Sequence, residues 1–224
     1  MAFSSLNKLE DAFAACEKAI ELDPIDVTNW DTIVYMLSHL NRLEEALAAC
    51  EKAISLDPTH PSPWNKKGLL LAAFEKNEEA IKSLKKARML DPEDSNTLES
   101  LAGFLYKLGK PEQAAELCAE ALTYAPNYNR ARLSLAAVYL TLGQEDLFAR
   151  TMTELEPLMA KETDPYTQAC YHALRNDLTK GLDFLAQACE TEPFFRYYAR
   201  NSPPLLARLA DHPRFKELTT AEPE

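Results

Sequence analysis

The sequence has little glycine and no long uninterrupted run of apolar residues. Only 5 of its 224 residues are glycine, against 14 prolines, which favours short connections broken by proline over glycine-rich loops. No stretch approaches the roughly 18 apolar residues of a membrane-spanning helix, and the N-terminus lacks the basic and apolar regions of a signal peptide. We therefore expect no membrane insertion. The five cysteines have no paired spacing, so we expect a reducing, cytoplasmic compartment.

Basic residues are fewer than acidic residues. The chain has 24 Lys and Arg against 35 Asp and Glu, a net charge of -11. An acidic chain repels phosphate backbones, so we expect no nucleic-acid partner. The hydrophobic share of 46% and the charged share of 26% are ordinary for a folded globular protein, and they argue against general disorder.

Motifs for chemistry are absent from the sequence. It contains no glycine-rich phosphate loop, no nucleophile elbow and no zinc-protease signature. The four histidines stand far apart, without the short spacing of metal ligands. Cys16, Cys50 and Cys118 occupy an equivalent position that Leu84 fills elsewhere, which indicates a core position. We expect no enzymatic activity, no catalytic residue, no metal and no cofactor.

A strict internal period dominates what is present. Similar segments such as EKAIELDP and EKAISLDP recur, each ending in proline. The prolines lie at intervals of 34 residues, at Pro24, Pro58, Pro92 and Pro126. A period of this length is typical of a solenoid built from one repeated supersecondary unit. Three full units follow from it: 27–60, 61–94 and 95–128.

Each unit predicts two helices. Apolar residues spaced by three and four, as at Trp30, Ile33, Val34 and Leu37, place one apolar face on the first helix. A short break follows, at Asn41, Asn77 or Gly109 in the three units. The second helix carries small residues that let two helices approach closely: Ala46, Ala53, Ala80, Ala87, Ala114 and Ala121.

These features resemble the tetratricopeptide repeat family. The match rests on Trp64, Gly68, Leu71, Ala80, Ala87 and Pro92, and it covers about residues 8–193. The resemblance implies an all-α, right-handed superhelical solenoid of antiparallel helix pairs with about five and a half repeats. The expected divisions are a half repeat 8–26, repeats 27–60, 61–94, 95–128, 129–162 and 163–193, a C-terminal helical cap 194–218, and a disordered tail 219–224.

The resemblance also implies a binding surface. In this family the first helices line a concave groove, so we expect a protein or peptide partner there, with apolar anchors and some basic character. The candidate partner-binding residues are the first-helix positions that lie off the core stripe: Asp31, Tyr35, Asn65, Lys66, Leu69, Glu99, Gly103, Tyr106, Leu133, Ala137, Leu140, Thr167 and Tyr171.

Three functional interpretations remain open. The first is a stand-alone scaffold or adaptor that binds a partner segment in the groove. The second is a recruiting or regulatory module of a larger enzyme or of an assembly or secretion machine, which the half repeat slightly favours. The third is self-association through the half repeat, whose missing first helix would leave Phe13, Cys16 and Ile20 exposed to a neighbour.

Overall fold

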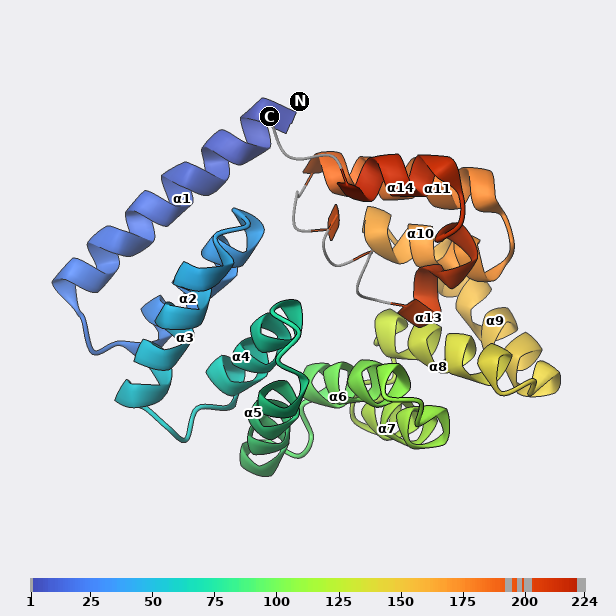
Figure 1. Ribbon diagram of the computed structural model, residues 1–224, viewed down its shortest axis with the longest axis horizontal. Coiled ribbons are helices and arrows are strands. Elements are labelled where there is room, and N and C mark those ends of the chain that lie inside the picture. Colours follow the sequence, from blue (N-terminus) through green and yellow to red (C-terminus); the bar gives the residue numbers. More distant parts are fainter. Residues whose placement is uncertain (1, 192–194, 197–198, 200–202, 221–224) are drawn as a thin grey trace. The chain divides into compact units, whose positions relative to one another are not determined.

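The computed structural model describes residues 2–191, 195–196, 199 and 203–220, and within them all regular secondary structure is helical. The predicted all-α class and the pairing of helices are confirmed (Figure 1). The chain divides into two compact units, one running up to residue 92 and one spanning 93–190 with 195–224. No helix in the described ranges is long and apolar enough to cross a membrane.

The first unit contains two helix pairs preceded by a single helix. In each pair the two helices pack on one another, and α1 packs on α2. The bounds are α1 (Ala2–Leu22), α2 (Val27–His39), α3 (Leu43–Leu56), α4 (Pro61–Ala73) and α5 (Asn77–Leu90). The first helices of the two pairs, α2 and α4, are in contact with each other.

The second unit continues the same pattern and ends in a differently organised segment. The paired helices are α6 (Ser95–Lys107), α7 (Pro111–Tyr124), α8 (Asn129–Thr141), α9 (Glu145–Met159), α10 (Pro165–Leu174) and α11 (Leu178–Thr191). The first helices of these pairs form a row in which α8 contacts both α6 and α10. After them come α13 (Pro203–Leu206), the 3-10 helix η1 (Ala207–Leu209) and α14 (Pro213–Thr220).

Small residues bring the paired helices together. The six alanines predicted to allow close approach are all fully buried. Gly68 serves the same purpose in α4, because a Cβ at that position would lie 2.6 Å from Leu84 Cγ on α5. Cys50, Leu84 and Cys118 are also fully buried, so the interpretation of this position as core is confirmed for these three. Cys16, at the equivalent position of α1, is only partly buried.

Every first helix ends in a left-handed residue that turns the chain into the second helix. The residues with positive φ are Asn41, Glu75, Gly109, Gly143 and Asn176. In the first pair, the amide of Arg42 donates to the Leu37 carbonyl at 2.8 Å, which is the backbone bond of a Schellman helix end. The prediction of a break at Asn77 was wrong: Asn77 already begins α5, and Glu75 makes the turn.

A side-chain donor ties each of three first helices to the proline that closes the preceding repeat. The indole nitrogens of Trp30 and Trp64 donate to the carbonyl oxygens of Pro24 and Pro58, at 2.9 Å and 3.0 Å. The guanidinium of Arg132 likewise donates to the carbonyl oxygen of Pro126, at 2.6 Å. The family's tryptophan therefore supplies both apolar area and a donor for a carbonyl that the helix end leaves unpaired.

Two expectations about the ends of the chain need correction. Phe13, Cys16 and Ile20 are not a free face, because they are partly buried against the core of α2 and α3. The predicted disordered tail began at residue 219, yet Thr219 lies within α14, is 2% exposed and donates its hydroxyl to the Phe215 carbonyl at 2.9 Å. Residues 221–224 of that tail lie outside the described ranges.

Glu75 offers a test of the turn geometry. The left-handed conformation is about 1 kcal/mol less favourable for a residue with a Cβ, and glycine avoids this strain. We expect Glu75→Gly to raise the free energy of unfolding by about 1 kcal/mol in urea titration. Glu116→Gly, in the exposed interior of α7, is the matched control and should lower it by a similar amount. Destabilisation by both changes would contradict the assignment.

Candidate protein-binding surface

We use the term first-helix face for the surface formed by α2 and α4 in the first unit and by α6, α8 and α10 in the second. All thirteen candidate residues come from these helices. They fall at recurring positions of the 34-residue period, as with Tyr35 and Leu69. The structure differs from the expectation in how many of them are accessible.

In the first unit, the charged candidates Asp31 and Lys66 form an ion pair with each other. Lys66 Nζ of α4 lies 2.8 Å from Asp31 Oδ2 of α2 and also donates to the Asp31 backbone carbonyl at 2.9 Å. Ser62 donates its hydroxyl to both Asp31 carboxylate oxygens, at 3.0 Å and 2.9 Å. This carboxylate and this ammonium therefore compensate each other across two neighbouring repeats.

The apolar candidates of the first unit remain accessible. Tyr35 is 48% exposed and Leu69 is 38% exposed. They occupy equivalent places on α2 and α4, which are in contact, and the Tyr35 ring lies 4.0 Å from the ring of His39. Asn65, between them in the sequence, is only 7% exposed, so it offers little surface to a partner.

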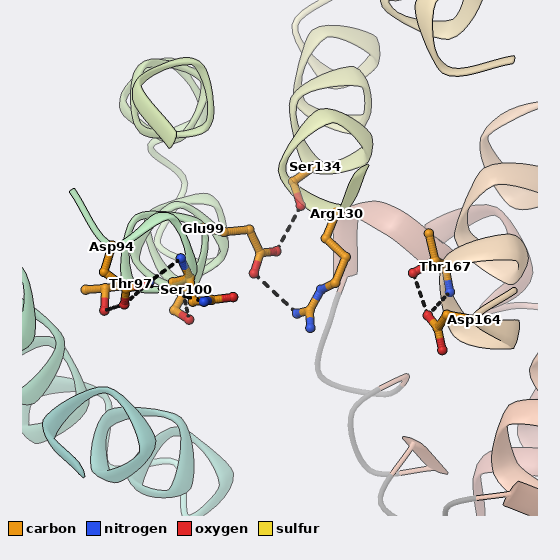
Figure 2. A network of polar contacts seen from close by, with 9 residues as sticks. Asp94, Thr97, Glu99, Ser100, Arg130, Ser134, Asp164 and Thr167 are labelled. Carbon is orange, nitrogen blue, oxygen red and sulfur yellow. Dashed lines mark hydrogen bonds and ion pairs between the residues drawn. The ribbon is translucent and has the colours of Figure 1, made fainter. Parts of the chain in front are cut away.

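In the second unit, the Glu99 carboxylate also binds a hydroxyl and a cation of the next first helix. Figure 2 shows Glu99 of α6 between two side chains of α8. Glu99 is 6% exposed, accepts from Ser134 Oγ at 3.1 Å and lies 3.3 Å from an Arg130 guanidinium nitrogen. Arg130 and Ser134 follow Glu99 by 31 and 35 residues, the same separations that relate Ser62 and Lys66 to Asp31.

The repeated polar link has a structural role. A carboxylate on one first helix accepts from two side chains on the next, one period later. Because donors and acceptor must meet in one register, the link favours a single alignment of neighbouring repeats. Sequence reasoning listed Asp31 and Glu99 as ligand contacts, and the missed signal was the recurrence of donors at fixed separations after each acid.

The other residues in Figure 2 begin helices. Asp94 precedes α6 and accepts from the Thr97 amide at 3.0 Å, and Asp164 precedes α10 and accepts from the Thr167 amide at 2.8 Å. These are N-cap bonds, which stabilise a helix start by typically about 1 kcal/mol. Thr167, predicted to contact a partner, is therefore a buried capping partner at 4% exposure.

The remaining candidates of the second unit are mostly covered. Gly103 faces open space, since a Cβ there would meet no atom within 4 Å. Tyr106 is partly exposed and its hydroxyl lies 3.0 Å from Thr141 Oγ1. Leu140 is partly buried, and the others lie in the core: Leu133 is fully buried, Ala137 is 2% exposed and Tyr171 is 5% exposed. These three side chains are therefore not accessible to a partner in this structure, contrary to the expectation of an open groove.

The chain's own C-terminal segment packs in the same region. α13 lies against α8, α10 and α6, and its Leu205 and Leu206 belong to the same core cluster as Leu133, Ala137 and Tyr171. Sequence reasoning assigned 194–218 to a cap and did not place any of it on the first helices. No local signal in the sequence specifies such a long-range contact.

Four of the five cysteines are buried, with a raised thiol pKa. Burial raises the pKa of the Cys50 thiol to about 12 and that of Cys189 to about 11, and it moves the pKa values of Cys118 and Cys170 still further upward. Cys189 was expected to be partly exposed, but it is 3% exposed. Within the described part of the chain, no three His, Cys, Asp or Glu side chains gather as metal ligands.

Comparison with protein families gives a consistent result. One family model described as Tetratricopeptide repeat matches residues 65–129 and 104–155, and a second with the same description matches residues 1–26 and 27–60. The boundaries of the second match coincide with those of the predicted repeat 27–60. No curated protein matched the chain.

Several solved structures share the fold. "YrrB: a TPR protein with an unusual peptide-binding site" is 23% identical over 83% of this chain and 98% of that one, with a TM-score of 0.52. "PilW, widely conserved type IV pilus biogenesis factor" is 15% identical over 98% and 95%, with a TM-score of 0.63. PilF of Pseudomonas aeruginosa is 19% identical over 87% and 90%, with a TM-score of 0.60. At these identities the likeness concerns the fold alone.

The thiol environments predict selective reactivity. A raised pKa removes the thiolate that reacts with disulfide reagents, and Cys16 is the partly accessible cysteine of the five. We expect one thiol to react rapidly with Ellman's reagent in the native protein at neutral pH and five in denaturant. Cys16→Ser should abolish the rapid phase. Two or more rapid thiols in the native protein would contradict the burial described.

The polar link in the second unit predicts a measurable stability cost. Arg130→Met leaves the buried Glu99 carboxylate without its cation. Because the Arg130 side chain is 37% exposed, we expect a loss of about 2 kcal/mol in unfolding free energy rather than the full cost of a buried pair. Arg150→Met is the control: its side chain is 79% exposed and pairs with Glu154, so its loss should stay within about 0.5 kcal/mol. Equal losses would argue against the link.

Proposed function

Because this chain belongs to the tetratricopeptide repeat family, we propose that it is a non-enzymatic binding module that holds a segment of another protein. The fold supports protein–protein interaction as the general activity. The binding site that we propose is the first-helix face of the first unit, formed by α2 and α4.

The exposure of Tyr35 and Leu69 carries this proposal. Two large apolar side chains on adjacent helices cost free energy in water, and a partner that covers them recovers about 25 cal/mol per Å² of buried apolar surface. Tyrosine is also a frequent interface anchor, because it combines apolar area with a hydroxyl at low conformational cost. The polar link between Asp31 and Lys66 holds the two helices that present these anchors.

The chemistry of the partner follows from what this surface leaves unsatisfied. Asp31 already accepts from Ser62 and Lys66, so it gives no reason for the basic character first expected of the ligand. The accessible features are the tyrosine ring and the leucine side chain. The proposed partner segment therefore presents apolar side chains, either from one face of a helix or from an extended peptide.

A stand-alone adaptor and a recruiting module of a larger assembly would use this surface in the same way. They differ in whether one partner or several are held at once. We favour the adaptor, because the first unit presents the one pair of large exposed apolar side chains found on a first-helix face among the described residues.

The test is quantitative capture of partners from a native lysate. Tyr35→Ala with Leu69→Ala should reduce capture of a specific partner at least about ten-fold, since hot-spot residues contribute 2 kcal/mol or more. The control combines Met89→Ala and Tyr124→Ala, which remove large apolar side chains, 76% and 46% exposed, from the second helices α5 and α7. Thermal melting verifies that both variants stay folded.

The control should capture partners as the wild type does. If both double variants lose the same partners, or if neither loses any, the first-helix face of the first unit is not the binding surface.

A further inference from the structure

We propose that residues 203–209 are an internal ligand of the second unit, and that its first-helix face accepts a partner segment with the pattern Leu-Leu-x-Arg-Leu in their place. This inference rests on the proposed function, because it assumes that first-helix faces bind protein segments. It goes further in assigning a second surface, its present occupant and the chemistry that the surface selects.

The position of the segment is the first argument. α13 contacts α8 and α10, and also α6, which are the first helices of three successive repeats. η1 contacts α10 as well, and Leu209 lies beside Gly181 of α11. A segment that only closed the end of the stack would contact the last pair alone, whereas this one also reaches the first helices α6 and α8.

The depth of burial is the second argument. Leu205, Leu206 and Leu209 are 4%, 1% and 0% exposed. They belong to one apolar cluster with Leu133, Ala137 and Tyr171 of the first helices. Leu209 approaches so closely that its Cδ1 would lie 3.4 Å from a Cβ at Gly181. The three leucines therefore act as anchors, in the way that hot-spot side chains do at an interface.

The repeat symmetry supplies the third argument. Ala137 and Tyr171 stand at the positions that Tyr35 and Leu69 occupy in the first unit, one or more periods earlier. In the first unit these positions are exposed. In the second unit, Gly103 at the same position faces open space, while Ala137 and Tyr171 are buried within the cluster that holds the C-terminal leucines. The face is thus open in the first unit and occupied at α8 and α10 in the second, and the occupant shows which chemistry fits.

One polar bond fixes the orientation of the segment. The Arg208 guanidinium donates to the Leu174 backbone carbonyl at 2.6 Å, near the end of α10. Carbonyls at a helix end lack partners within the helix, so an arginine at this place in the segment is recognised. The partner motif therefore needs the arginine as well as the three leucines.

The internal segment also sets a threshold for external partners. A covalently attached segment competes at an effective concentration in the millimolar range for short linkers. An external segment with the same motif therefore binds only if its affinity outweighs this effective concentration, or if the binding of the internal segment is weakened. The face is then available to strong partners and closed to weak ones.

The experiment uses the full chain and a fluorescein-labelled peptide of residues 203–212, followed by fluorescence polarisation. The releasing variant carries Leu205→Ser and Leu206→Ser. We expect it to bind the peptide at least about ten-fold more tightly than the wild type, because its own segment no longer competes. A peptide with the same two serine changes should bind neither protein.

An arginine pair provides a milder comparison. Arg208→Ala removes the bond to Leu174 and should tighten peptide binding at least about three-fold relative to the wild type. Arg214→Ala removes an ion pair between α14 and Asp183 of α11, leaves α13 intact and should bind the peptide as the wild type does. Should the releasing variant lose its helical circular dichroism, this pair decides.

The proposal is overturned by equal peptide affinity in the wild type and in Arg208→Ala. It is also overturned by a folded releasing variant that does not bind the peptide, or by a dimer in light scattering that exchanges the segment between copies. None of these results touches the capture experiment on Tyr35 and Leu69, which concerns the other unit. Failure of this inference is therefore distinguishable from failure of the proposed function.

Discussion

The close approach of paired helices at small residues is the constraint on which the rest of the structure depends. The alanines at equivalent positions of the repeats are fully buried, and Gly68 leaves no room for even a methyl group beside Leu84. This contact forces each first helix against its second helix. It thereby determines which residues of the first helix remain for contacts outside the pair, and so creates the first-helix face.

Much of this organisation could be predicted, because it depends on local chemistry that repeats every 34 residues. The buried alanines, the helix pairs and the core position of Cys50 and Cys118 follow from side-chain size and spacing. The turn at Glu75 could not be predicted, since glutamate carries no preference for a left-handed conformation. The burial of Leu133 and Tyr171 was missed. They share a core cluster with the C-terminal leucines, and such long-range contacts leave no periodic signal in the sequence.

The two units use the same face differently. In the first, a carboxylate–ammonium link joins α2 to α4 while Tyr35 and Leu69 stay accessible. In the second, a carboxylate–guanidinium link joins α6 to α8, and Ala137 and Tyr171 are buried in one cluster with the C-terminal leucines. The polar links join neighbouring first helices, and the apolar positions are the ones that we propose for binding, so residues one turn apart on a helix have separate roles in this account. This division explains why the acidic candidates proved to be structural.

Amide hydrogen exchange of the full chain, with and without a captured partner, tests the central claim most directly. Binding on the first-helix face of the first unit should slow exchange in α2 and α4, while α3 and α5 exchange as in the free protein. Protection confined to α3 and α5 would place the partner on the second helices. That result would contradict the account, since it would leave the exposed Tyr35 and Leu69 without a binding role.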